Sequence, residues 1–215
     1  MPKLKDKISI IAHRGLWKNK YQQNTIKSLV NAMSNGFGIE FDVRDAFGEI
    51  VISHDYAKSS KKIEFFKNLI LKYKKLNLKS TLAINIKSDG LSGKIKKILK
   101  VNKVSNYFVF DMSFPEKIMY KKKGLNFFNR MSEFERNSKF DLHSKGLWID
   151  CFKRIWYNKE IIKKIKYNNL CFVSPELHRR KNYKRLWYFL KKLKIKKNLS
   201  VCTDYPIKAR KFFND

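Results

Sequence analysis

The sequence is poor in acidic residues, in cysteines and in long hydrophobic runs. No apolar run approaches the roughly 18 residues that a membrane-spanning helix needs, so we expect no integral membrane segment. The first apolar run, ISIIA, is too short for a secretory signal and leads straight into polar residues. We therefore expect a cytoplasmic protein.

The cysteines are Cys151, Cys171 and Cys202. Their odd number and wide spacing, with no CxxC pattern, support neither a disulfide framework nor a zinc site. We expect reduced thiols that are buried or half-buried.

The shortage of acidic residues leaves a strongly positive chain, with 49 basic and 18 acidic residues and a formal net charge of +31. Such a field attracts polyanions, including phosphate-bearing polymers and anionic membrane surfaces, to which we expect a weak attraction. The alternative is that most lysines are solvated surface residues with no dedicated partner. Because the chain shows no nucleic-acid-binding module, we expect no specific nucleic acid partner.

Short apolar or β-rich runs alternate along the chain with segments of helical spacing. The runs are residues 8–12, 37–43, 50–53, 81–86, 106–110, 125–131, 146–150, 170–174 and 199–203. A first helix is expected after Asn24 or Thr25, either of which would cap it, and before Gly36. The other helical segments are residues 63–73, 91–101, 115–123, 132–140, 159–165, 183–193 and 206–213.

If residues 50–53 form a hairpin return, eight strands and eight helices remain. This count predicts an α/β fold, a small TIM (β/α)₈ barrel that occupies residues 1–215 as a single domain. The segment between His54 and Asn85 is short, so the barrel would have no large cap insertion. Active sites of such barrels lie at the carboxyl ends of the strands.

Two neighbouring strands carry polar residues at alternate positions. Glu40 and Asp42 lie two residues apart and so face the same side of their strand, and Asn85 and Lys87 repeat the spacing on the next strand. Carboxylates buried inside a barrel must be paired or bound to a cation. A cation site and ion pairs with nearby arginines are the two interpretations.

Two histidines follow strand candidates in the same part of the chain. His13 and Arg14 close the first run, and His54 and Asp55 follow the third. Two imidazoles near neutral pH can take up and release a proton, and a guanidinium can hold a phosphate. This combination is suited to cleaving a phosphodiester.

Several motifs together resemble the glycerophosphodiester phosphodiesterase family, which is related to the phosphoinositide-specific phospholipases C. They are HRG at 13–15, QNT at 23–25, GIEFDVR at 38–44, VISHD at 51–55 and CTDYP at 202–206. The resemblance implies a TIM barrel that hydrolyses phosphodiesters and a role in lipid metabolism. By the same resemblance, the general acid and base would be His13 and His54, and the residues that hold the phosphate would be Arg14 and Lys87.

The resemblance also implies a divalent cation, Mg²⁺ or Ca²⁺, held by Glu40, Asp42 and Asn85. This chain departs from the family pattern at two positions, because Gln23 and Asn85 stand where the family usually has acidic residues. An asparagine carbonyl still coordinates such cations, although more weakly than a carboxylate.

Further acidic residues follow the later strand candidates, and each is a candidate addition to the site. They are Glu133, Asp150, Glu176 and Asp204. The alternative for each is a cap or loop hydrogen bond, and the same holds for His178.

Two hypotheses about function remain. The first is a metal-assisted phosphodiesterase whose open site and positive charge favour a bulky or polymeric phosphodiester. The second is a catalytically weakened barrel that binds a phosphate-bearing ligand or polyanion. Retention of both histidines favours the first hypothesis, because binding alone needs no proton-transfer pair.

Overall fold

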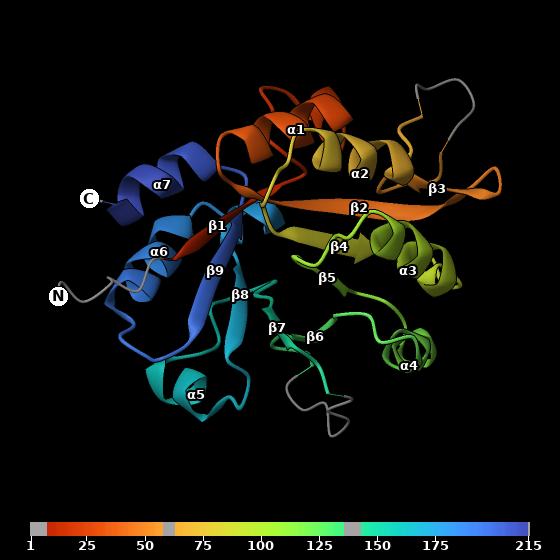
Figure 1. Ribbon diagram of the computed structural model, residues 1–215. Coiled ribbons are helices and arrows are strands. Elements are labelled where there is room, and N and C mark those ends of the chain that lie inside the picture. Colours follow the sequence, from red (N-terminus) through yellow and green to blue (C-terminus); the bar gives the residue numbers. More distant parts are fainter. Residues whose placement is uncertain (1–7, 58–62, 136–142, 215) are drawn as a thin grey trace, which may run out of the picture. The chain divides into compact units, whose positions relative to one another are not determined.

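A computed structural model describes residues 8–57, 63–135 and 143–214, in which strands and helices alternate (Figure 1). The strands are β1 (Ser9–His13), β2 (Gly38–Ala46), β3 (Glu49–Ile52), β4 (Leu82–Ile86), β5 (Tyr107–Phe110), β6 (Phe128–Met131), β7 (Gly146–Ile149), β8 (Asn169–Val173) and β9 (Asn198–Thr203). The α-helices are α1 (Ile26–Ser34), α2 (Phe66–Lys75), α3 (Ser92–Val101), α4 (Phe114–Lys122), α5 (Lys159–Lys164), α6 (Tyr183–Lys192) and α7 (Pro206–Asn214). Two 3₁₀ turns, η1 (Lys20–Gln22) and η2 (Pro175–His178), complete the set.

The chain divides into two compact units. The N-terminal unit is Ala12–Phe127, and the C-terminal unit combines Met1–Ile11 with Phe128–Asp215. Strand β1 contributes residues to both units.

In the N-terminal unit the strands run in the order β1, β2, β4, β5. Strands β2, β4 and β5 are parallel, whereas β3 pairs antiparallel with β2, so the predicted hairpin return is confirmed. Helices α1 and α2 lie along one side of β2 (Figure 1). There Phe41 of β2 stacks on Phe66 of α2, and both rings are fully buried. An apolar side chain of β2 therefore packs against the apolar stripe of α2.

Helix α1 begins and ends as its sequence predicts. The Thr25 hydroxyl accepts a hydrogen bond from the Ser28 amide and caps the helix. At the other end Gly36 has a φ of +78°, a left-handed conformation that favours glycine. The helix buries Leu29 and Met33 on its inner face.

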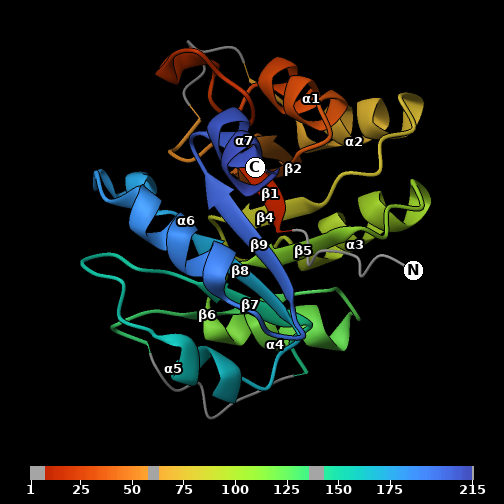
Figure 2. The same ribbon diagram turned by 90° about the vertical axis from the view of Figure 1, so that its left-hand side faces the viewer.

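In the C-terminal unit β6, β7, β8 and β9 form parallel pairs in that order. Helix α6 runs alongside β8 and β9 (Figure 2), and its Trp187 is buried in the core of this unit. The cysteines are all buried and free, which confirms the expectation of reduced thiols.

The predicted helix at 132–140 is wrong in its first four residues, which are not helical, and its remainder lies outside the described residues. Ser132 and Glu135 exchange two backbone hydrogen bonds of 3.3 Å, and the Ser132 hydroxyl accepts from the amides of Phe134 and Glu135. These local bonds replace the helical ones.

No helix within the described ranges is long and apolar enough to cross a membrane.

Candidate active site

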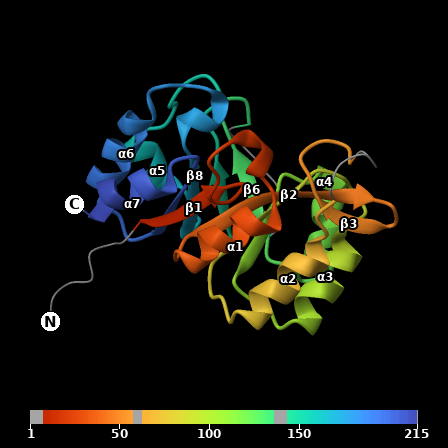
Figure 3. The ribbon, with the colours of Figure 1, turned by 90° about the horizontal axis from the view of Figure 1, so that it is seen from above.

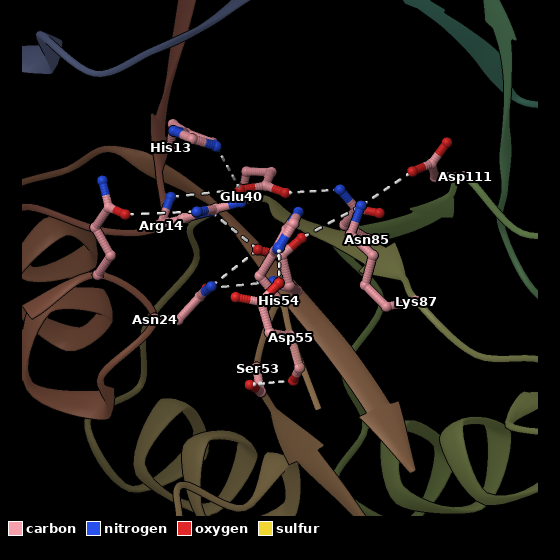
Figure 4. Close-up of polar contacts among 12 residues, drawn as sticks. His13, Arg14, Asn24, Glu40, Ser53, His54, Asp55, Asn85, Lys87 and Asp111 are labelled. Atoms are coloured by element: carbon pink, nitrogen blue, oxygen red, sulfur yellow. Dashed lines mark hydrogen bonds and ion pairs between the residues drawn. The ribbon is translucent and has the colours of Figure 1, made fainter. Parts of the chain in front are cut away.

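Two buried carboxylates belong to the candidate site, which lies in the N-terminal unit. Figure 4 shows one of them, Glu40, between His13 and Asn85. Glu40 and Asp42 alternate on β2, and each is only 1% exposed. The parallel register of β2 and β4 places Asn85 opposite Asp42. Three oxygen-bearing side chains therefore share one patch of two adjacent strands.

Asp42 is surrounded by donors and cations. Its Oδ2 atom lies 3.0 Å from Arg14 Nε and accepts a hydrogen bond of 2.9 Å from Asn24 Nδ2. Its Oδ1 atom lies 3.6 Å from Lys87 Nζ. A charge taken out of water needs such compensation. The ion pair that the sequence left open as the alternative to a cation site is thus present with Arg14.

Glu40 has weaker partners. Its Oε1 atom accepts a hydrogen bond of 3.2 Å from Asn85 Nδ2, and its Oε2 atom accepts one of 3.4 Å from the Arg14 amide. His13 Nε2 lies 3.8 Å from Oε2. Burial, together with the charge of Asp42, raises the pKa of Glu40, and the nearby His13 and Arg14 offset only part of this rise.

The turn that presents Arg14 depends on Gly15. This glycine has a φ of +90°, and a Cβ atom on it would lie 2.7 Å from the backbone carbon of Ser28. The turn is tied at both sides, because the Arg14 amide donates to the Glu40 carbonyl and the Arg14 carbonyl accepts from the Asn24 amide. Only glycine fits here, so the HRG motif has a structural reason as well as a chemical one.

His54 follows β3 on a segment that is bonded to β2. The Ser53 amide donates to the Asp42 carbonyl at 3.0 Å. His54 Nδ1 lies 2.8 Å from Asp55 Oδ1, and this hydrogen bond lowers the pKa of Asp55. The His54 side chain is 47% exposed, so its ring is open to solvent.

Arg44 was expected only as an alternative ion-pair partner of Glu40 and Asp42, and the sequence did not indicate the contacts that it makes with backbone carbonyls. It is buried, and its guanidinium donates to the carbonyl oxygens of His54 at 3.3 Å and Lys87 at 3.4 Å. The same group lies 4.0 Å from the centre of the Tyr56 ring. Arg44 lies two residues after Asp42 on β2, so the two side chains point to the same side of the strand. This spacing is the sequence signal that could have identified Arg44 as a site residue.

Two further members of the cluster were also missed. Asn24, which the sequence offered as a helix cap and as part of the QNT motif but not as a site residue, donates to Asp42. Asp111 accepts a hydrogen bond of 3.1 Å from Lys87 Nζ. Asp111 directly follows β5, and a polar residue after an apolar strand is the signal that was available.

The four additional acidic candidates all belong to the C-terminal unit. Glu133 accepts hydrogen bonds from the amides of residues 152–154. Although burial raises the pKa of Glu133, these backbone hydrogen bonds outweigh that effect and lower it. Such a loop hydrogen bond is the alternative that the sequence left open for Glu133.

Asp150 follows β7 and pairs with a histidine. Its Oδ1 atom lies 2.5 Å from His178 Nε2, and the His178 ring packs on Phe152 with ring centres 4.6 Å apart. Glu176 accepts hydrogen bonds from the Thr203 hydroxyl and the Asp204 amide. Their membership of the site stays a prediction.

The oxygen-bearing side chains of the N-terminal unit decide whether a divalent cation fits the site. Within the described ranges, no set of three His, Cys, Asp or Glu side chains is arranged to hold a metal ion. However, Asp42 Oδ1 and Asn85 Oδ1 are both buried without a hydrogen bond. With Glu40 they supply the carboxylate and amide oxygens that hard cations prefer, so the donor chemistry fits.

Neither a protein-family model nor a curated protein matches the sequence. Solved structures do match. A candidate glycerophosphodiester phosphodiesterase from Galdieria sulphuraria is 15% identical, with a TM-score of 0.77 over 97% of this chain and 98% of that one. An Oleispira antarctica phosphodiesterase in complex with the product sn-glycerol-3-phosphate is 18% identical, with a TM-score of 0.69 over 97% and 98%. A glycerophosphodiester phosphodiesterase from Parabacteroides distasonis is 19% identical, with a TM-score of 0.67 over 98% of both chains.

The chain has the fold of a small TIM barrel, which confirms the predicted fold class. TIM-barrel enzymes carry their active sites at the carboxyl ends of the strands. His13 closes β1 and Lys87 directly follows β4, so the candidate site lies where the fold places catalytic residues.

Proposed function

We propose that this chain is a phosphodiester hydrolase of the glycerophosphodiester phosphodiesterase type. The observation that carries the proposal is the cluster around Asp42, in which Arg14 and Lys87 lie beside a buried carboxylate. His13 lies beside Glu40, and His54 is held next to the same strand. The likeness in fold to phosphodiesterases, one of them in complex with sn-glycerol-3-phosphate, supports the same reaction class.

The two histidines divide the proton transfers. His54 Nδ1 faces Asp55, whose ionised carboxylate accepts a hydrogen bond from Nδ1–H. This tautomer leaves Nε2 as a base for the attacking water. His13 would then give a proton to the leaving alkoxide. The bond from phosphorus to that alkoxide breaks as the bond to the water oxygen forms.

The charge on the phosphate is met by side-chain cations. Arg14 can present two parallel N–H groups to the non-bridging oxygens, whereas Lys87 acts as a point charge. Both already lie within 4 Å of Asp42. A phosphate that enters the site would therefore meet two cations that are already positioned. Charges fixed in advance stabilise a transition state because they need no reorganisation during the reaction.

A divalent cation, Mg²⁺ or Ca²⁺, would be held by Glu40, Asp42 and Asn85. When bound, it would offset further negative charge on the phosphate oxygens. The support for this cation site is that Asp42 Oδ1 and Asn85 Oδ1 are both buried without a hydrogen bond.

We further propose a bulky or polymeric phosphodiester as the substrate. The segment from β3 to β4 contains a single described helix, α2, so no described element there caps the site, and the net charge of +31 attracts polyanions. The second candidate, a barrel that binds a phosphate-bearing ligand without cleaving it, is favoured by one observation. Asn85, a neutral side chain, stands opposite Asp42, which limits the charge available for a cation.

The test compares His13→Gln and His54→Gln with a matched control, His143→Gln, whose histidine is exposed in the C-terminal unit. Hydrolysis of glycerophosphocholine and of a polyol-phosphate polymer is measured for each protein. We expect both site variants to lose activity by roughly 100-fold or more while the control keeps it, and EDTA to lower the activity of the unmodified protein.

Undiminished hydrolysis in both site variants would contradict the catalytic assignment. Faster turnover of glycerophosphocholine than of the polymer would contradict the proposal of a polymeric substrate. If the unmodified protein binds glycerol 3-phosphate in calorimetry but cleaves neither substrate, the hypothesis of a phosphate-binding barrel replaces the hypothesis of a hydrolase.

A further inference from the structure

A set of lysines gathers where α2, α3 and α4 end. We call it the basal lysine surface, and its members are Lys74, Lys75, Lys79, Lys100, Lys103, Lys121, Lys122 and Lys123. All of them are exposed. Within the described part of the chain, none of them forms an ion pair with an acidic side chain.

These lysines lie on neighbouring segments. Helices α2 and α3 run side by side (Figure 3). The turns that follow the helices are hydrogen-bonded to one another, because Asn106 Nδ2 donates to the Lys79 carbonyl at 2.8 Å and the Leu82 amide donates to the Asn106 carbonyl at 3.0 Å. Lys96 of α3 donates to the Gly124 carbonyl just after α4. The three groups of lysines therefore form one surface of the N-terminal unit.

This surface lies at the opposite end of the β/α units from the candidate site. The helices return antiparallel to the parallel strands, so the end of α2 precedes the start of β4 and the end of α3 precedes the start of β5. Among the site residues, His13 closes β1, Asn85 lies near the carboxyl end of β4 and Lys87 directly follows it. A partner on the basal lysine surface thus leaves the catalytic side chains accessible.

The positive charge is not balanced locally. Residues 65–88 and 90–110 contain no aspartate or glutamate. The helix dipole favours a cation in the last turn of each helix, which accounts for some of these lysines. It does not account for Lys79 and Lys103, which follow the helix ends.

The chemistry of the surface favours a lipid over a nucleic acid. Exposed aliphatic side chains lie among the lysines, with Leu76 51% and Val101 67% exposed. The chain has no arginine between Arg44 and Arg130, so this surface lacks the guanidinium forks that read bases and grip nucleic-acid phosphates. Lysines interspersed with aliphatic groups are instead typical of proteins that rest on anionic bilayers.

We propose that the basal lysine surface docks on an anionic lipid surface. Phospholipid headgroups bind the ammonium groups, and Leu76 and Val101 contact the boundary with the acyl chains. The proposal does not depend on the proposed hydrolase activity, because it concerns residues outside the candidate site.

The test uses full-length protein and sedimentation with vesicles of phosphatidylcholine, with and without phosphatidylserine. One variant replaces Lys75, Lys79, Lys100, Lys103 and Lys122 by glutamine. The matched control replaces the same number of exposed lysines in the C-terminal unit, namely Lys159, Lys164, Lys184, Lys192 and Lys194, so that both variants lose equal charge. Glutamine keeps the helix propensity of lysine, and circular dichroism checks the fold of both.

We expect the unmodified protein and the control to bind the anionic vesicles and the basal variant to bind on the order of 100-fold more weakly. Binding should also weaken as salt rises. Equal losses in both variants would show that net charge alone drives the attraction and would overturn the proposal. Tighter binding to a short DNA duplex than to the anionic vesicles, lost in the basal variant, would assign the surface to nucleic acid and would overturn it as well.

Discussion

Asp42 and Asn85 are register partners on parallel strands, and each leaves one buried oxygen without a hydrogen bond. For Asp42 Oδ1 the nearest charge is Lys87 Nζ at 3.6 Å, and for Asn85 Oδ1 no hydrogen bond compensates for its burial. Buried oxygens without a hydrogen bond are costly, and we propose that a cationic ligand compensates for this cost. The neutral amide of Asn85 would then limit how strongly a divalent ion is held.

Changing Asn85 to Asp should therefore raise the affinity for Ca²⁺ or Mg²⁺ by about tenfold, because a carboxylate replaces a neutral ligand of the same shape. Calorimetric titration without substrate measures this directly. Without the ion the variant should unfold more easily, since three carboxylates then lie together.

Asn68→Asp is the matched control, because it adds the same charge on the exposed surface of α2. Equal affinities in the two variants would show that Asn85 is no ligand.

The sequence predicted the strands of the fold closely because parallel strands buried on both faces read as continuous apolar runs. The helix predicted from residue 132 is absent at 132–135, where the Ser132 hydroxyl accepts hydrogen bonds from nearby backbone amides. The spacing of hydrophobic residues gives no information about such local hydrogen bonds. Helix α2 begins at Phe66 rather than at 63, a displacement of the kind expected at helix ends.

For the candidate site, the sequence indicated the residue types and strand ends but not the contacts. Asn24 and Asp42 are 18 positions apart, and Arg44 reaches the Lys87 carbonyl across 43. Which side chains meet over such separations depends on strand register, and no local pattern encodes it.

Arg44 should position His54 and Lys87, since its guanidinium binds the backbone carbonyls of both. We expect Arg44→Met to lower kcat by about 10- to 100-fold with a smaller change in KM, because small displacements of catalytic groups are costly. Arg44→Lys should recover part of the loss, as one carbonyl can still be bound. Steady-state kinetics and the unfolding midpoint are measured together.

Tyr56→Leu serves as the companion, because it removes only the exposed ring over the guanidinium. If Arg44→Met loses stability while kcat stays unchanged, the residue is structural only.

Gly15→Ala should destabilise the fold by about 2 kcal/mol or more, since the new methyl group meets the Ser28 backbone at 2.7 Å and the φ of +90° strains any side chain. Gly36→Ala tests the conformational strain alone. Gly36 has a similar φ of +78° with no atom within 4 Å of the new Cβ, so about 1 kcal/mol is expected. Urea denaturation measures both, and equal losses would mean that the close approach to Ser28 relaxes at no cost.

Glu176 should make stability depend on pH, because burial raises its pKa above the ordinary value of 4.5. A carboxyl whose pKa is higher in the folded than in the unfolded state stabilises the fold fully below about pH 4.5. This contribution is lost as the pH rises through the folded-state pKa. The loss is about 1.4 kcal/mol for each factor of ten by which the proton affinities of the two states differ. Glutamine does not titrate, so the unfolding free energy of the unmodified protein minus that of Glu176→Gln should fall between pH 4.5 and 7.5. Glu133→Gln should show the opposite slope below about pH 4.5, since backbone hydrogen bonds lower the pKa of Glu133 and its contribution is lost as the pH falls. Two slopes of the same sign would contradict the proposed causes, namely that burial raises the pKa of Glu176 and that backbone hydrogen bonds lower the pKa of Glu133.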